Sequence, residues 1–262
     1  MPKKFPLEIT ILGSGTSAGV PMIGCHCPVC SSSDPRDRRT RTSIAIAYNN
    51  HVVLVDTAPE LRLQAIANDL DAVHAVVFTH AHADHIFGLD DLRRYNTLLH
   101  ALLPIYAAPE TLCSLKRVFP YAFGKQETEK DVYRPELLPN EISGPFDLFG
   151  ASWQPIPLIH GRAKVLGFRI GSFAYCTDCS EIPAESLGQL AGLEVLIIDA
   201  LRPRPHPAHL NFAEALEVIE KLRPQRAYFT HLSHDVLHVD GEKSLPAHVK
   251  FCYDGLKLDV AG

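Results

Sequence analysis

Seven residues, from Thr79 to His85, constrain this chain more than any other stretch. They read Thr-His-Ala-His-Ala-Asp-His and follow an apolar run over residues 73–78. Imidazole binds zinc, copper, iron and nickel, and a carboxylate adds charge and can orient a water. Metal-binding histidines on a helix recur four residues apart, which this spacing does not match. We therefore predict a buried strand that ends in a tight loop, with the imidazoles and the carboxylate gathered around one point.

The apolar patterning predicts two groups of strands with helices between them. This order is typical of an α+β chain in which two sheets pack face to face with helices outside, an αββα four-layer sandwich with its chemistry at one edge. Strands are predicted over 7–12, 43–48, 51–56, 73–78, 102–107, 146–155, 167–170, 172–176, 195–199 and 226–230, with a final hairpin over 249–260. Helices are predicted over 59–70, from the histidine loop to about 99, from 109, over 187–191 and from the N-cap Asn211 to 222.

Length and charge limit the classes of protein that this chain can be. Its 262 residues predict a single domain over 1–262, with a polar loop at 24–41 and a flap at 121–141. A net charge of −5 argues against a general nucleic-acid surface but allows a small phosphorylated substrate. The chain shows neither a signal-peptide pattern nor an apolar run of about 20 residues, so we expect a cytoplasmic protein without a membrane partner.

Three of the seven cysteines crowd into the loop at 24–41, as Cys25, Cys27 and Cys30. In a reducing compartment this spacing indicates metal binding rather than disulfides, and three thiolates form most of a tetrahedral zinc site. The neighbouring His26 would be strained as the fourth ligand. His234 is the best candidate, with His238 and Cys252 as alternatives, and buried free thiols remain the competing interpretation.

Further polar residues end or follow predicted strands, namely His160, Asp178, His209 and His231. Together with the motif at 80–85, their order and spacing resemble those of the metallo-β-lactamase superfamily over nearly the whole chain. The resemblance implies the metallo-β-lactamase fold and two divalent ions, zinc or manganese. It implies that the first ion is held by His80, His82 and His160, that the second is held by Asp84, His85 and His231, and that Asp178 bridges the two.

Within the superfamily, the cysteine cluster and the spacing of His231 and His234 are similar to those of the phosphodiesterase of the carbon–phosphorus lyase pathway. This resemblance implies one structural zinc held by Cys25, Cys27, Cys30 and His234. It also implies that His209 contacts the substrate as a proton donor or phosphate clamp, which suits an imidazole near pH 7. The alternatives are that His209 is a loop histidine that bonds the backbone near the helix start, or that His206 takes this role, for which it is the weaker candidate. We take Asp84 and His209 as the catalytic residues.

The implied function is a metal-dependent phosphodiesterase that hydrolyses small, cyclic or nucleotide-like phosphodiesters. Two ions about 3.5–4 Å apart can share a bridging hydroxide and neutralise charge on the phosphoryl oxygens. The expected partners are a small phosphodiester and, from the relatives, a second copy in a homodimer, without extended nucleic acid. The alternatives are an RNA-processing nuclease, a thioesterase or lactonase, and a non-catalytic binding protein like the one that assists pyrroloquinoline quinone biosynthesis.

Four minor interpretations also follow from the sequence. Cys176 and Cys179 form a Cys-Xaa-Xaa-Cys pair that would suit redox chemistry or a metal. The glycine-rich loop at 13–19 is mainly a tight backbone passage, with a phosphate cradle as the alternative. Asp56 and Asp199 each end a predicted strand, as a carboxylate that orients a ligand histidine would.

Overall fold

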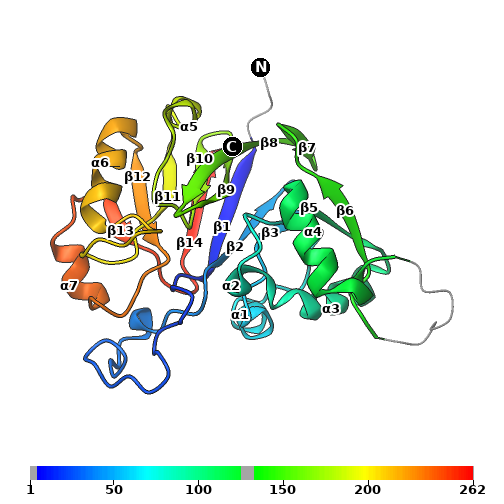
Figure 1. The fold of residues 1–262 in the computed structure, drawn as a ribbon, viewed down its shortest axis with the longest axis horizontal. Coiled ribbons are helices and arrows are strands. Elements are labelled where there is room, and N and C mark those ends of the chain that lie inside the picture. The colour runs from blue at the N-terminus through cyan, green and yellow to red at the C-terminus, as the bar shows by residue number, and fades with distance from the viewer. Residues whose placement is uncertain (1–4, 125–132, 262) are drawn as a thin grey trace.

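The structure is a computed structural model that describes residues 5–124 and 133–261. It contains two seven-stranded sheets that lie face to face (Figure 1). The first sheet has the order β14 (Lys257–Ala261), β1 (Pro6–Gly13), β2 (Ser43–Tyr48), β3 (His51–Val55), β4 (Ala75–Val77), β5 (Leu103–Ala107) and β6 (Leu137–Glu141). The second has the order β13 (Val249–Phe251), β12 (Arg226–Thr230), β11 (Val195–Asp199), β10 (Phe173–Cys176), β9 (Ala163–Ile170), β8 (Ala151–His160) and β7 (Phe146–Leu148).

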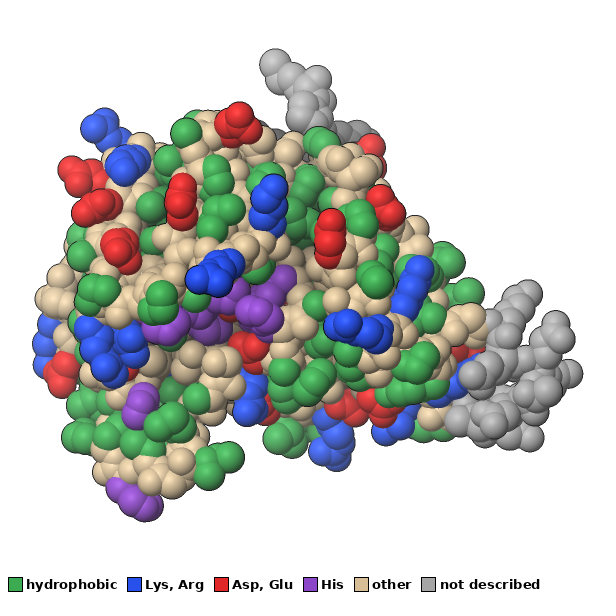
Figure 2. Space-filling model, in the orientation of Figure 1, with side chains coloured by type: hydrophobic (Ala, Val, Ile, Leu, Met, Phe, Trp, Pro, Cys, Tyr) green, Lys and Arg blue, Asp and Glu red, His purple; other side chains and the backbone are tan. Residues whose placement is uncertain are grey.

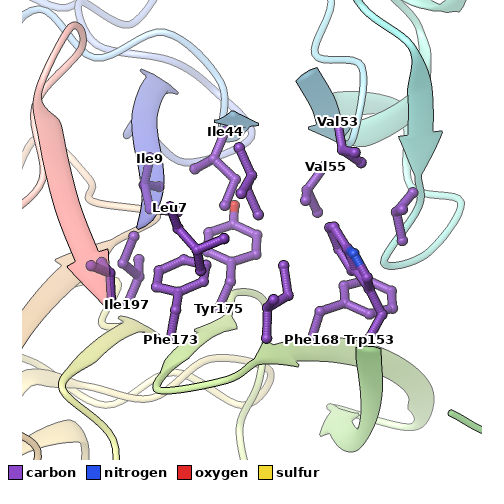
Figure 3. Close-up of a cluster of buried hydrophobic side chains, with 14 of the residues drawn as sticks. Leu7, Ile9, Ile44, Val53, Val55, Trp153, Phe168, Phe173, Tyr175 and Ile197 are labelled. Atoms are coloured by element: carbon purple, nitrogen blue, oxygen red, sulfur yellow. The ribbon is translucent and has the colours of Figure 1, made fainter. Parts of the chain in front are cut away.

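The inner faces of the two sheets share one apolar core (Figure 3). Alternate residues of β1, such as Leu7 and Ile9, point into it, because successive side chains of a strand alternate between its faces. Trp153 of the second sheet is fully buried there, and its Nε1–H donates to the hydroxyl of Tyr48 at 3.0 Å. That hydroxyl donates in turn to the carbonyl of Leu148 at 2.9 Å. The polar ends of both aromatic side chains are therefore satisfied inside the core.

Helices cover the outer face of each sheet, and each side has its own apolar cluster. Over the first sheet lie α1 (Leu61–Ala67), α2 (Ala83–Ile86), α3 (Arg93–Leu99) and α4 (Pro109–Val118), with 3-10 turns η2 (Leu89–Leu92) and η3 (Pro120–Ala122). Over the second lie α5 (Ala184–Gln189), α6 (Phe212–Leu222) and α7 (His238–Lys243). The predicted αββα four-layer sandwich is confirmed. None of the helices in the described part of the chain has the length and apolar character that crossing a bilayer requires.

Most predicted elements match, and the exceptions have local causes. The predicted strand at 146–155 is wrong, because Phe149 and Gly150 both have positive φ and turn the chain between β7 and β8. The predicted hairpin at 249–260 is also wrong, since β13 pairs with β12 and β14 pairs with β1 in the other sheet. Of the segment 121–141, predicted as a flap, 125–132 lie outside the described residues and Leu137–Glu141 form β6 beside β5.

Candidate metal centre

The predicted metal ligands come from four separate segments and meet at one edge of the sandwich. The loop after β4 carries His80 and His82 and leads into α2, which carries Asp84 and His85. The remaining three follow strands of the second sheet: His160 ends β8, Asp178 lies two residues beyond β10, and His231 follows β12 directly. Histidine side chains gather in a hollow in the middle of the face seen in Figure 2.

Three residues at this edge have backbone angles that are uncommon for side chains other than glycine. Asp56, Asp178 and His231 have φ values of 65°, 52° and 60°. Each lies within two residues of a strand end, so the chain turns sharply there and directs the side chain toward the edge. Aspartate and histidine tolerate the left-handed region better than most residues, yet such conformations cluster at functional sites.

The ligand atoms form two groups that share Asp178. The first group holds His80, His82, His160 and Asp178, and the second holds Asp84, His85, His231 and Asp178. In the second group, Asp178 Oδ1 lies 3.2 Å from His85 Nε2, and Asp178 Oδ2 lies 3.4 Å from His231 Nε2. In the first group, the same Oδ2 lies 3.8 Å from His160 Nε2 and 3.9 Å from His80 Nε2. One carboxylate thus faces both groups, as the predicted bridging role requires.

The donor set fits two divalent ions. Ligand bonds of about 2.1 Å at tetrahedral angles separate nitrogen and oxygen ligands by about 3.4 Å. Asp84 Oδ2 lies 3.5 Å from His85 Nε2 and 3.6 Å from His231 Nε2, close to that value. The Nε2 atoms of His80, His85 and His231 are buried and have no hydrogen-bond partner among the described residues. A bound cation satisfies such orphaned atoms, because a buried polar atom without a partner is costly.

Asp56 orients one histidine of each group. Its Oδ2 accepts a hydrogen bond from His85 Nδ1 at 2.7 Å, which leaves His85 Nε2 free for a metal. The same oxygen accepts from the hydroxyl of Thr79 at 2.8 Å, and that hydroxyl lies 2.9 Å from His80 Nδ1. Since the Thr79 proton is used on the carboxylate, the Thr79 oxygen accepts from His80. Asp56 therefore orients predicted ligand histidines, as the sequence indicated.

Burial and the neighbouring charges shift the pKa values of the candidate ligands in ways that favour a bound cation. Burial lowers the pKa of His80 well below its ordinary value. Burial also acts against a charged His85, but the carboxylates of Asp178 and Asp56 raise the pKa of His85 well above its ordinary value. Although burial opposes it, the nearby imidazoles of His231 and His85 hold the pKa of Asp84 far below its usual range. Without a metal, an extra proton on His85 therefore balances these carboxylates, whereas His80 stays neutral.

A histidine–carboxylate pair lies beside the two groups. His209 Nδ1 lies 2.8 Å from Asp199 Oδ2, and both residues are buried. The ring of His209 stacks on His231 with ring centroids 4.5 Å apart and meets His160 edge-on at 4.6 Å. The structure thus brings His209 to the metal centre. Asp199, predicted to orient a ligand histidine, has its hydrogen bond to His209 instead.

The cysteine cluster forms a second, separate donor set. The Sγ atoms of Cys25, Cys27 and Cys30 lie 3.3, 3.4 and 3.5 Å from His234 Nδ1. Zinc–sulfur bonds of 2.3 Å and a zinc–nitrogen bond of about 2.05 Å at tetrahedral angles separate sulfur and nitrogen by about 3.6 Å. A backbone hydrogen bond from Cys30 lowers the pKa of Cys27 to about 6, whereas burial raises that of Cys30 to about 11. The set fits one zinc ion, with His234 in the place of the predicted fourth ligand.

Buried polar contacts connect the cysteine loop to the strand end that carries His231. Arg39 is fully buried, pairs with Asp37 at 3.1 Å and donates to the carbonyls of Ser233 and Val236. Asp37 also accepts from the backbone N–H of His238 at 2.7 Å. The two donor sets therefore share one short segment, because His234 lies three positions after His231.

The competing interpretations of other motifs lose support. Cys176 and Cys179 are fully buried among apolar side chains, and burial raises the pKa of Cys176 to about 12, so neither thiol has the thiolate character that redox chemistry needs. In the glycine loop, a Cβ on Gly15 would lie 2.4 Å from the carbonyl oxygen of Arg39. The amides of Gly15 and Thr16 donate to Thr40 and Leu232, so the loop is a packed backbone passage rather than a phosphate cradle.

Two contributors were not found from the sequence. Thr79 connects Asp56 to His80, but a threonine carries no titratable group that would single it out. The buried pair of Asp37 and Arg39 lies in a polar segment that reads as a solvated basic loop. Only the folded chain shows that this pair faces inward.

A family model described as the beta-lactamase superfamily domain matches residues 51–232. The chain belongs to this superfamily. Its fold and its site define a metal-dependent hydrolase of the metallo-β-lactamase fold.

The relatives narrow this class. A crystal structure described as a new diphosphatase from the PhnP family is 42% identical to this chain, with a TM-score of 0.92 and 99% of each chain covered. The chain is thus close to the PhnP subfamily, which confirms the predicted resemblance. An octanoyltransferase of Porphyromonas gingivalis is 38% identical over 97% of this chain, which spans 52% of that relative's length. Zinc-bound PqqB from Methylobacterium extorquens, 19% identical with a TM-score of 0.79 over 97% of this chain and all of that one, shares the fold.

Proposed function

We propose that this chain is a phosphodiesterase that hydrolyses small phosphate diesters at a two-metal centre. The proposal is carried by one arrangement: two donor groups share Asp178, and His209 with its partner Asp199 lies against them. In this proposal the first ion is held by His80, His82 and His160, the second by Asp84, His85 and His231, and both by Asp178. A structural zinc is held by Cys25, Cys27, Cys30 and His234.

Bound zinc or manganese ions would supply a water of lowered pKa and positive charge for the phosphoryl oxygens. The chain's own residues hold these parts in place. Asp56 and the backbone carbonyl of Ala208 hold the imidazoles of His85 and His160 through their Nδ1 atoms, at 2.7 Å in each case. Each Nε2 is thereby left free to face the ions, and the ring orientation is fixed before a substrate arrives.

His209 is the proton donor to the leaving oxygen in this proposal. Its Nδ1–H donates to Asp199, so Nε2 is the atom that can carry a proton to the substrate. The amide of Cys179 donates to the same carboxylate oxygen of Asp199 at 2.9 Å, which holds the carboxylate in place. A fixed imidazole of this kind contributes roughly 10²- to 10⁴-fold to a rate.

Small substrates are favoured over nucleic acid. A net charge of −5 opposes a long polyanion, whereas metal ions attract one or two phosphates locally. The complete donor set supports catalysis rather than the binding role of the pyrroloquinoline quinone proteins. One relative is named octanoyltransferase, although this chain spans only about half of its length. Because of that name, a thioester remains the competing candidate substrate.

The test compares substrates on the purified metal-loaded chain. We expect manganese- or zinc-dependent hydrolysis of bis(p-nitrophenyl) phosphate and of a nucleoside 2′,3′-cyclic phosphate. A chromogenic octanoyl thioester should be cleaved much more slowly. Thioester turnover without diester turnover would overturn the proposal. His82→Ala, which removes one proposed ligand from an exposed position, should abolish diester turnover, whereas the exposed and remote His248→Gln should not.

A further inference from the structure

The loop between Leu201 and Leu210 forms the rim of the metal centre next to His209. Its two ends are tied together by the hydrogen bond from the Leu201 amide to the Leu210 carbonyl, at 2.9 Å. The Leu210 amide donates to the Cys179 carbonyl at 2.7 Å, which fixes the loop to the turn after β10. The loop is therefore closed at its base and attached to the turn that carries Asp178.

The two backbone polar groups of Ala208 each form a hydrogen bond to a histidine. Its carbonyl accepts from Nδ1 of His160, a proposed metal ligand, at 2.7 Å. Its amide donates to Nδ1 of His206 at 3.3 Å. Gly161 allows the close approach, because a Cβ there would lie 3.3 Å from the Cβ of Ala208. His206 is thus positioned against the same frame as the metal centre.

The hydrogen bonds give His206 and His209 opposite tautomers. His206 accepts at Nδ1, so its proton is on Nε2. His209 donates from Nδ1 to Asp199, so its Nε2 is the variable position. The two ring centroids lie 5.1 Å apart, and the rings are tilted by 43°. Among the described residues, Nε2 of His206 has no hydrogen-bond partner, so this half-buried N–H is available to a ligand.

The surroundings of His206 favour a neutral ring. Burial and the neighbouring His209 and Arg202 lower its pKa, so that it stays uncharged near pH 7. A neutral imidazole whose Nδ1 is already occupied can donate from Nε2 but cannot act as a base there. His206 is therefore suited to hold an oxygen rather than to transfer a proton.

We propose that His206 is a positioning residue that donates its Nε2–H to an anionic oxygen on the leaving group, and that the preferred substrates are diphosphate diesters. This inference rests on the proposed function. A donor beside His209 lies on the side of the leaving oxygen. The leaving group of a diphosphate diester carries anionic oxygens next to that oxygen, whereas a simple aryl or alkyl leaving group carries none.

The reaction consumes one water. The water oxygen bonds to one phosphorus, the bond from that phosphorus to the bridging oxygen breaks, and His209 supplies a proton to the bridging oxygen. The products are two phosphate monoesters. The same kind of bond is named for the 42% identical diphosphatase, whereas the role of His206 comes from the hydrogen bonds of this chain.

The test compares His206→Ala, His206→Gln and His206→Asn on two substrates, ADP-ribose and bis(p-nitrophenyl) phosphate. We expect His206→Ala to lose roughly 10- to 100-fold in kcat/KM on ADP-ribose, the size expected for a lost hydrogen bond to a charged group, and less than about threefold on the aryl diester. The amide nitrogen of glutamine reaches the place of Nε2, so His206→Gln should restore much of the loss. Asparagine reaches only the place of Nδ1 and should not.

Binding supplies a second readout. The nonhydrolysable α,β-methylene analogue of ADP-ribose should bind His206→Ala more weakly by a similar factor, with metal content and melting temperature unchanged. His248→Gln, an exposed histidine away from the rim, is the matched control. Equal losses on both substrates, or none on either, would overturn the role of His206. Failure of the wild-type chain on both substrates would instead overturn the proposed function itself.

Discussion

Oδ2 of Asp56 lies 2.7 Å from Nδ1 of His85, and both side chains are fully buried. Through the hydroxyl of Thr79, the same oxygen also fixes His80, which belongs to the other donor group. One carboxylate that touches neither proposed ion therefore sets the orientation of a ligand to each of them. Such outer partners control the tautomer and the basicity of a ligand histidine.

We predict that Asp56→Asn weakens metal binding at both positions. Asp56 accepts from His85 and the Thr79 hydroxyl at Oδ2 and from the Thr79 backbone N–H at Oδ1, whereas the amide has only one acceptor oxygen and would set its NH2 group against one of these donors. Loss of such a partner typically costs about 10- to 100-fold in metal affinity. Competition with a chelator at fixed pH measures the change. Asp147→Asn, on an exposed residue of β7, should keep wild-type affinity. If only one of the two ions were weakened, the shared role of Asp56 would be wrong.

Metal binding should release protons, and metal affinity should rise with pH. Although burial lowers it, the nearby carboxylates of Asp178 and Asp84 raise the pKa of His231 from an ordinary 6.5 to about 9. A metal must displace that proton at pH 7 but not above about pH 9. Zinc titrations in buffers of different ionisation enthalpy measure the released protons, and buffer-independent heats at pH 7 would contradict the prediction.

The metal-free chain should show the opposite trend. The folded-state pKa of His231 is raised, so its contribution to stability is fully present below about 6.5 and is lost as the pH rises through about 9. The melting temperature of the chelated protein should therefore fall between pH 7 and pH 9. The metal-loaded protein should not share this decline, because its imidazoles are already unprotonated.

The candidate residues of the centre could be picked out from the sequence because their chemistry is concentrated. Four of the proposed ligands lie within six positions after a buried strand, and strand ends of parallel sheets meet at one edge. The role of Thr79 and the inward direction of Arg39 could not be predicted, since both depend on contacts between distant segments. The pairing of the last strand, β14, could not be predicted either, for the same reason. Asp254 accepts from Ser14 and Thr40, and this contact lies where the chain crosses from β13 to β14 in the other sheet.

Removing the partner of His209 should affect substrates according to their leaving groups. Asp199→Asn leaves the carbonyl oxygen or the amide to face His209 Nδ1, so the ring is no longer held in one tautomer. We expect kcat to fall by roughly 10²- to 10⁴-fold on an alkoxide leaving group, such as the ribose oxygen of a nucleoside 2′,3′-cyclic phosphate, because this group needs a proton. The loss should be much smaller on p-nitrophenolate, a stable anion. A uniform loss on both, with reduced metal content, would indicate that Asp199 supports the metals instead.

The cysteine cluster should control the active centre without touching the substrate. Cys27→Ala removes one of three sulfurs around His234, and His234 lies three residues after the proposed ligand His231. Loss of the zinc frees this segment, although Arg39 still ties it to the loop through Ser233 and Val236. We expect one fewer zinc per chain, a lower melting temperature and a reduced kcat. Atomic emission and thermal unfolding measure the first two. Cys113→Ser, an exposed cysteine on α4, should change none of them. Full activity and stability in Cys27→Ala would falsify the structural-zinc assignment, because a tetrahedral site that loses a thiolate loses most of its contribution to folding.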